Sequence, residues 1–191
     1  MSVKDLLYKT GAMTKSKYRV LDERYPYFIT SSTVDWIPVF SISECVEIML
    51  DSLNFLMVKR DIKLLGYVIM KDHFHCIVMG QGLPVKIGSM KSYTARKIID
   101  HLIEQKNSTI LSKLELKKGS YKKDSSYQLW QEGYHPQQIY SRKMMEQKLD
   151  YIHHNPVAGN YCAHPSEWLY SSYHNYYDTG KAVIPISDYV F

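Results

Sequence analysis

Two histidines separated by a single phenylalanine are the most distinctive side chains of this sequence. They form the triplet His73-Phe74-His75 within the apolar stretch 68–78. Side chains of a β-strand alternate between its two faces, so His73 and His75 would point the same way while Phe74 enters the core on the other face. Two imidazoles about 7 Å apart along a strand can bind one metal ion. Chance occurrence of the pair is the alternative that the triplet alone leaves open.

A second reactive pair lies much further along the chain, in the segment 151–156. Tyr151 and Asn155 are four residues apart, which puts them on one face of a helix. Tyrosine has a pKa of about 10 and is a poor nucleophile at neutral pH, so it needs a phosphate polarised by a cation. Two imidazoles and one amide oxygen form a neutral ligand set that leaves room for phosphate oxygens. Mg²⁺ or Mn²⁺ suits such a set, and the histidine pair makes Mn²⁺ particularly acceptable.

The histidine pair must be held by a β-sheet. Segments rich in β-branched and aromatic residues predict the positions of its strands. The predicted strands cover 25–34, 62–70 and 73–79, with a further short strand after a loop in 129–139. The connection between the second and third strands, Lys71-Asp72, is short enough to form a hairpin turn. Asp72 is therefore interpreted as a turn residue, with an additional metal ligand as the alternative. The polar segment 106–127 is expected to be a loop.

Three segments have the periodicity of amphipathic helices, and one of them must carry Tyr151. The predicted helices cover 42–56, 85–104 and 141–155. Ser41 and Glu44 have the spacing of a capping box for the first helix. Ser141 is expected to cap the third. Pro156 disfavours helical geometry at the residue before it, so the third helix is expected to end at Asn155.

Basic residues are concentrated in the segment 86–123, which has ten Lys and Arg against three Asp and Glu, whereas the whole chain carries a net charge of +5. This excess favours a surface that contacts phosphates, and a solvated helix face is the alternative. Lys91, Arg96 and Lys97 are the candidate contacts to a nucleic-acid backbone. Trp130 is interpreted as a core residue and not as a platform for bases.

The length of 191 residues predicts one domain with tails. We expect a basic N-terminal arm over 1–24, a catalytic domain over 25–176 and a C-terminal tail over 177–191. The three cysteines form no CxxC pair, and the sequence has neither a signal-peptide block nor a membrane-spanning apolar run. These features together predict a cytoplasmic protein with no membrane partner.

Together, the motifs resemble those of the single-tyrosine HUH transposases, and within that superfamily the sequence is most similar to the REP-associated tyrosine transposases. A His-hydrophobe-His triplet alone is a weak signal, but its combination with a downstream Tyr-x-x-x-Asn-Pro is strong. The resemblance extends from about Tyr27 to Tyr173. The matching segments are 66–70, 72–75, 91–97, 151–159 and 168–172.

The resemblance implies an α+β fold, a ferredoxin-like antiparallel β-sheet with helices packed on one face. His73 and His75 would be metal ligands, with Asn155 as the third, and the cofactor would be Mg²⁺ or Mn²⁺. Tyr151 would attack a DNA phosphate to form a 5′-phosphotyrosine link and release a 3′-OH. The implied substrates are single-stranded DNA with imperfect hairpins from palindromic repeats, and the implied protein is a monomer or a homodimer.

Several alternatives remain open at this point. Tyr134 and Tyr140 are rival nucleophiles, although neither shares a helix face with a suitable ligand, and His154 is a rival ligand or proton shuttle. At the level of the whole protein, a catalytically idle hairpin-binding or single-strand-binding protein derived from a transposase competes with the enzyme. A replication or conjugation nickase is disfavoured, because such proteins tend to carry helicase domains or paired tyrosines.

Overall fold

The computed structural model describes residues 20, 22–121 and 125–189, so the predicted N-terminal arm lies almost entirely outside the described residues. Four antiparallel strands form one sheet in the order β2-β3-β1-β4. The strands are β1 (Tyr27–Ser32), β2 (Lys63–Ile69), β3 (His73–Met79) and β4 (Gln137–Gln138). With helices after β1 and β3, this βαββαβ order is ferredoxin-like, which confirms the predicted α+β class.

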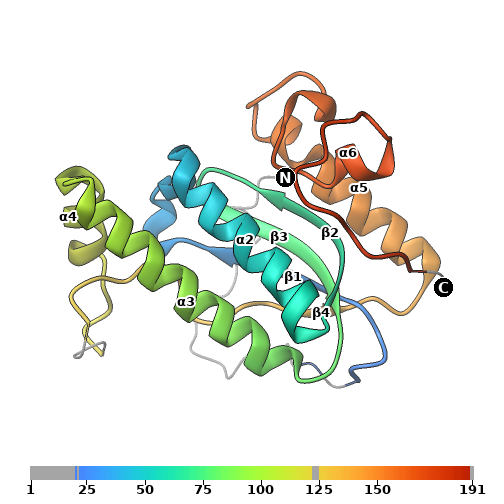
Figure 1. Ribbon diagram of the computed structural model, residues 1–191, viewed down its shortest axis with the longest axis horizontal. Coiled ribbons are helices and arrows are strands. Elements are labelled where there is room, and N and C mark those ends of the chain that lie inside the picture. The colour runs from blue at the N-terminus through green and yellow to red at the C-terminus, as the bar shows by residue number, and fades with distance from the viewer. Residues whose placement is uncertain (1–19, 21, 122–124, 190–191) are drawn as a thin grey trace.

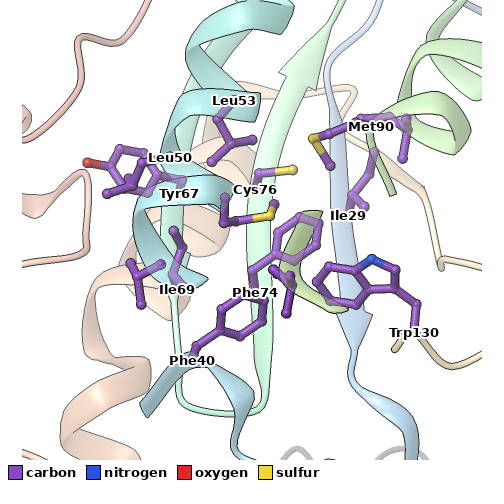
Figure 2. Packing of buried hydrophobic residues seen from close by; sticks show 14 of the residues in the cluster. Ile29, Phe40, Leu50, Leu53, Tyr67, Ile69, Phe74, Cys76, Met90 and Trp130 are labelled. Carbon is purple, nitrogen blue, oxygen red and sulfur yellow. The ribbon is translucent and has the colours of Figure 1, made fainter. Parts of the chain in front are cut away.

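Two long helices, α2 (Ser43–Arg60) and α3 (Leu83–Glu104), cover one face of the sheet (Figure 1). Alternate residues of β3 point into this layer, among them Phe74 and Cys76, which are fully buried. The Phe74 ring lies edge-on to Trp130 at 5.5 Å between centroids, with Phe40 beside both (Figure 2). This packing confirms Trp130 as a core residue and fixes which way β3 faces.

A third helix, α5 (Arg142–Ala158), lies against the opposite face of the sheet (Figure 1). Met145 and Ile152 are buried there against Val68 and Ile77 of the strands. The helices therefore cover both faces, because the other sheet face is also apolar and needs a partner. The side chains of His73 and His75 alternate with Phe74, so they point toward this α5 layer.

Three local expectations were wrong. Ile42 is the N-cap of α2 and no side chain caps it, so the capping box of Ser41 and Glu44 does not form. The segment expected to be a loop contains the helix α4 (Ser108–Leu116), which the Asn107 side chain caps by accepting a hydrogen bond from the Ile110 amide. Its Leu114 is fully buried, and that burial stabilises the helix. The polar residues around it made the segment look like a loop in the sequence.

The third correction concerns the end of α5, which passes Pro156 and continues to Ala158. Proline removes one backbone donor from the helix. The last turn is nevertheless stabilised by hydrogen bonds from the Gly159 amide to the Asn155 carbonyl and from the Tyr161 amide to the Pro156 carbonyl. The start of α5 is as predicted, with the Ser141 side chain accepting from the Met144 amide. Asn155 therefore lies inside a helix and not at its end.

The chain after α5 contains the short helices η3 (Pro165–Glu167) and α6 (Tyr173–Tyr176) and then runs along the free edge of the sheet beside β2. Backbone hydrogen bonds attach it there, from the Ile69 amide to the Tyr170 carbonyl at 2.9 Å, from the Ser172 amide to the Tyr67 carbonyl at 2.9 Å and from the Ser187 amide to the Leu64 carbonyl at 2.7 Å. Two further short helices, η1 (Val34–Trp36) and η2 (Val39–Ser41), connect β1 to α2. In the described residues, no helix is both long and apolar enough to cross a membrane.

Candidate active site

The histidine pair opens β3, directly after the β2–β3 turn, and both side chains are almost completely buried. Their ring centroids are 5.0 Å apart. Each is opposite a small β1 residue, with His75 paired with Thr30 and His73 with Ser32. The small side chains leave space for the rings on the α5 side of the sheet.

Hydrogen bonds to the ring nitrogens select one tautomer of each histidine, with the proton on Nδ1. His73 Nδ1 lies 2.6 Å from Asp72 Oδ1, and a carboxylate only accepts, so Nδ1 carries the proton. His75 Nδ1 lies 2.7 Å from Thr30 Oγ1, while its Nε2 lies 3.3 Å from Asn155 Nδ2, a donor. In both rings Nε2 is therefore the nitrogen with the free lone pair that a metal ligand requires, and in His75 this lone pair faces the Asn155 amide nitrogen.

Tyr151 and Asn155 reach the same place from α5. Besides its contact with His75, Asn155 hydrogen-bonds the Tyr151 side chain. The Tyr151 ring lies edge-on to His75 at 5.2 Å between centroids and edge-on to Phe28 at 5.8 Å. Tyr151 remains 39% exposed, whereas Asn155 is buried. The predicted nucleophile is thus open to solvent on one side and held against His75 on the other.

Burial sets the protonation states of these groups. It lowers the pKa of His75 well below its usual value, and electrostatic interactions with His73 and Lys148 add to the effect. Burial also raises the pKa of Tyr151 above its usual value, and the hydrogen bond from Asn155 opposes that rise. His75 is therefore a neutral imidazole and Tyr151 a protonated phenol at neutral pH.

The donor set fits a divalent cation that prefers mixed nitrogen and oxygen ligands. His73 Nε2 is buried and has no hydrogen-bond partner among the described residues, which is costly for a polar atom unless a ligand meets it. The His75 ring lies 5.0 Å from the His73 ring between centroids, and its Nε2 is 3.3 Å from the Asn155 amide nitrogen. In the described residues, no three His, Cys, Asp or Glu side chains are placed to hold a metal ion together, so any cation here needs the Asn155 oxygen or exogenous ligands.

Two residues of the site were not predicted as such from the sequence. Asp72 was interpreted as a turn residue, and its carboxylate also accepts a hydrogen bond from His73. Thr33 fixes the turn by donating to the Asp72 carbonyl from both its amide and its hydroxyl. Thr30 holds His75 across the sheet. Only the pairing of β1 with β3 brings Thr30 there, so no local sequence signal indicates it.

The predicted DNA contacts lie elsewhere, on α3. Lys91 and Arg96 line a groove of about 620 Å³ between α3 and the segment 125–134, and none of the site residues described above lines it. Lys91 donates to the carbonyls of Gln131 and Gly133. Lys97 does not line the groove but lies over the Tyr93 ring at 6.0 Å. The structure therefore separates these cations from the histidine pair, since α3 and α5 cover opposite faces of the sheet.

The rival residues do not join the site. Tyr134 lines the α3 groove, and Tyr140 is 70% exposed just before α5. His154 is on the exposed side of α5, where it pairs with Asp150 at 3.0 Å. In the described residues, Tyr151 is the tyrosine that contacts a member of the histidine pair.

The sequence matches no family model and no curated relative. Solved structures are nevertheless similar to it. The structure of a REP-associated tyrosine transposase bound to a REP hairpin superimposes with a TM-score of 0.64 at 16% identity, over 92% of this chain and 95% of the other. A candidate transposase from Deinococcus radiodurans gives a TM-score of 0.45 at 17% identity, over 75% of this chain and 98% of the other. The chain therefore has the fold of a REP-associated tyrosine transposase, as the resemblance of its motifs predicted.

Proposed function

We propose that this protein is a metal-dependent endonuclease and strand transferase that cleaves single-stranded DNA through a 5′-phosphotyrosine intermediate. The observation that carries the proposal is the meeting of four side chains from distant parts of one chain. His73 and His75 come from β3, and Tyr151 and Asn155 from α5, and the other three side chains each lie against His75. A neutral ligand set beside a tyrosine suits phosphoryl transfer. Neutral ligands do not cancel the positive charge of the cation, and three of them leave coordination positions for the phosphate.

In the proposed reaction, His73 Nε2, His75 Nε2 and the Asn155 amide oxygen would hold Mg²⁺ or Mn²⁺. The Asn155 amide nitrogen faces His75 Nε2 in this structure, so the amide would turn to present its oxygen to the cation. When bound, the cation supplies Lewis-acid polarisation of the phosphate. Tyr151 Oη forms the new bond to phosphorus and its proton passes to solvent. The bond from phosphorus to the 3′ oxygen breaks, and that oxygen takes a proton to become a free 3′-OH. Attack by a 3′-OH on the phosphotyrosine reverses these steps and joins strands without ATP.

The proposed substrate is DNA that forms imperfect hairpins from palindromic repeats. A similar fold is seen in a transposase bound to a REP hairpin, which supports the choice. The net charge of +5 also favours a polyanionic partner. Lys91, Arg96 and Lys97 are proposed to contact the DNA backbone away from the cleavage site.

The experiment that tests the proposal detects a covalent protein–DNA adduct. Labelled hairpin oligonucleotides with single-stranded flanks are incubated with the protein and Mn²⁺ or Mg²⁺, and adducts are separated by denaturing electrophoresis. We expect Tyr151→Phe to abolish the adduct and to leave hairpin binding within about twofold of the wild type, because only the phenolic oxygen is lost. Tyr140→Phe is the matched control and should form adduct at the wild-type rate.

A catalytically idle DNA-binding protein is the competing function. It predicts hairpin binding by the wild type with no adduct under any divalent cation, and that result would overturn the enzyme. Adduct formation by the Tyr151→Phe variant would instead reject the assignment of the nucleophile.

A further inference from the structure

One lysine beside the candidate nucleophile has no part in the proposed reaction. Lys148 lies one turn before Tyr151 on the same face of α5. Its Nζ lies 4.5 Å from the centre of the Phe28 ring. That ring stacks on His75 at 5.2 Å between centroids and meets Tyr151 edge-on. The ammonium is thus in the same layer of side chains as the histidine and the phenol.

Among the described residues, the charge of Lys148 has no acidic partner. Its Nζ donates to the neutral amide oxygen of Gln137 at 2.7 Å, and no ion pair of the described residues includes it. Arg142, also on α5, instead pairs with Glu146. The Lys148 side chain is only partly exposed, and burial lowers its pKa. Partial burial of a cation without an anion is unfavourable. The position of Lys148 therefore indicates a binding site for an anion.

Gln137 gives the ammonium a fixed position. It belongs to β4, the edge strand that pairs with β1 beside Phe28. A lysine bound from a strand and resting on an aromatic ring has fewer conformations than a solvated one, so little entropy is lost when an anion arrives. The alternative role, a purely structural cation–π contact, requires the ring but predicts no particular effect on DNA chemistry.

We propose that Lys148 Nζ, held by Gln137 above Phe28, forms a binding subsite for a non-bridging oxygen of the phosphodiester that Tyr151 attacks. This inference rests on the proposed function. Negative charge on the phosphate oxygens must be stabilised during the transfer, and a preorganised ammonium does so most effectively where water is partly excluded. Lys148 contributes a positive charge and Tyr151 the attacking oxygen, from neighbouring turns of one helix.

The test measures single-turnover adduct formation at saturating oligonucleotide, with the dissociation constant measured separately by fluorescence anisotropy. We expect Lys148→Met and Lys148→Gln to slow adduct formation at least about tenfold, with a smaller effect on binding. Lys148→Arg keeps the charge and should restore most of the rate. Lys143→Met, an exposed lysine of the same helix, is the matched control and should leave the rate unchanged.

A second measurement separates phosphate contact from a structural role. A methylphosphonate at the cleaved position removes one non-bridging oxygen and its charge. If Lys148 binds that oxygen, the substitution slows the wild type more than it slows Lys148→Met, so the two changes are not additive. Thermal unfolding checks that each variant is folded.

The outcomes are distinguishable. Absence of adduct with the wild type overturns the proposed function itself. Adduct formation by the wild type and by both neutral variants at equal rates overturns only the Lys148 subsite. Slow neutral variants combined with fully additive methylphosphonate effects also overturn it, because the lysine then acts through the structure of α5.

Discussion

At the scale of single residues, the site depends on side chains that hold the histidines and take no direct part in the chemistry. Asp72 accepts a hydrogen bond from His73 Nδ1 at 2.6 Å and thereby keeps the Nε2 lone pair toward the site. A carboxylate in this position also raises the basicity of the imidazole. Loss of its charge should therefore weaken cation binding without removing a ligand.

We expect Asp72→Asn to weaken Mn²⁺ affinity about 10- to 100-fold. Affinity is measured by calorimetric titration of the protein without DNA, and independently by the Mn²⁺ concentration that gives half-maximal adduct formation. Asp150→Asn, which alters the exposed pair with His154 on α5, is the control and should have no effect. Equal affinities of Asp72→Asn and the wild type would show that His73 does not depend on this carboxylate.

The sequence was sufficient to predict which of the four candidate side chains share a face, but not the side chains that hold them. His73 and His75 share a face by strand alternation, and Tyr151 and Asn155 by helical spacing, so both pairs follow from local geometry. The contact of Thr30 with His75 depends on strand register across 45 positions, which no local pattern encodes.

At the scale of elements, the approach of α5 to the sheet is set by a glycine. A Cβ built on Gly66 of β2 would lie 2.8 Å from the Leu149 Cδ2 on α5, which is too close for two carbon atoms. The missing side chain thus lets the helix that carries Tyr151 pack closely on the strand next to β3. An added methyl group must displace either the Leu149 side chain or the helix.

We expect Gly66→Ala to lower the free energy of unfolding by about 1 kcal/mol through overpacking. In a Leu149→Ala background the same change should have little effect, because the clashing atoms are gone. Urea unfolding of the two single variants and the double variant measures both values. Gly88→Ala on α3 is the control, since an added Cβ there meets no atom within 4 Å and stability should be equal or higher. Additive effects of Gly66→Ala and Leu149→Ala would contradict the proposed close contact.

Element boundaries were predictable where periodicity is strong and not where tertiary packing decides. The strand bearing the histidines begins and ends at the predicted residues. Helix α4 was missed because its few apolar residues bury only against the rest of the domain. The extension of α5 through Pro156 was missed for a similar reason, since the buried proline is held by its surroundings despite its missing donor.

At the scale of the whole molecule, the fold assembles the candidate site within a single chain. The sequence left open whether Tyr151 meets its own histidines or those of a second copy. In the structure, Tyr151 and His75 of one chain are in ring contact at 5.2 Å, and Asn155 of that chain reaches the His75 Nε2. The ferredoxin-like order makes this possible, because α5 follows the edge strand β4 and returns across the face of β3 and β2 that α2 and α3 do not cover.

We therefore expect two inactive variants not to complement each other. His75→Ala retains the tyrosine and Tyr151→Phe retains the histidines, so a site shared between chains would form adduct on the His75→Ala protein when the two are mixed. A site within one chain forms none, because neither protein holds both elements. Tags of different mass on the two variants identify the labelled chain by electrophoresis. Wild type titrated with Tyr151→Phe is the control, and its adduct per wild-type chain should stay constant whether or not the chains associate. Adduct on the His75→Ala chain would show that α5 is donated to another copy, and that the contact between Tyr151 and His75 in one chain is not the functional one.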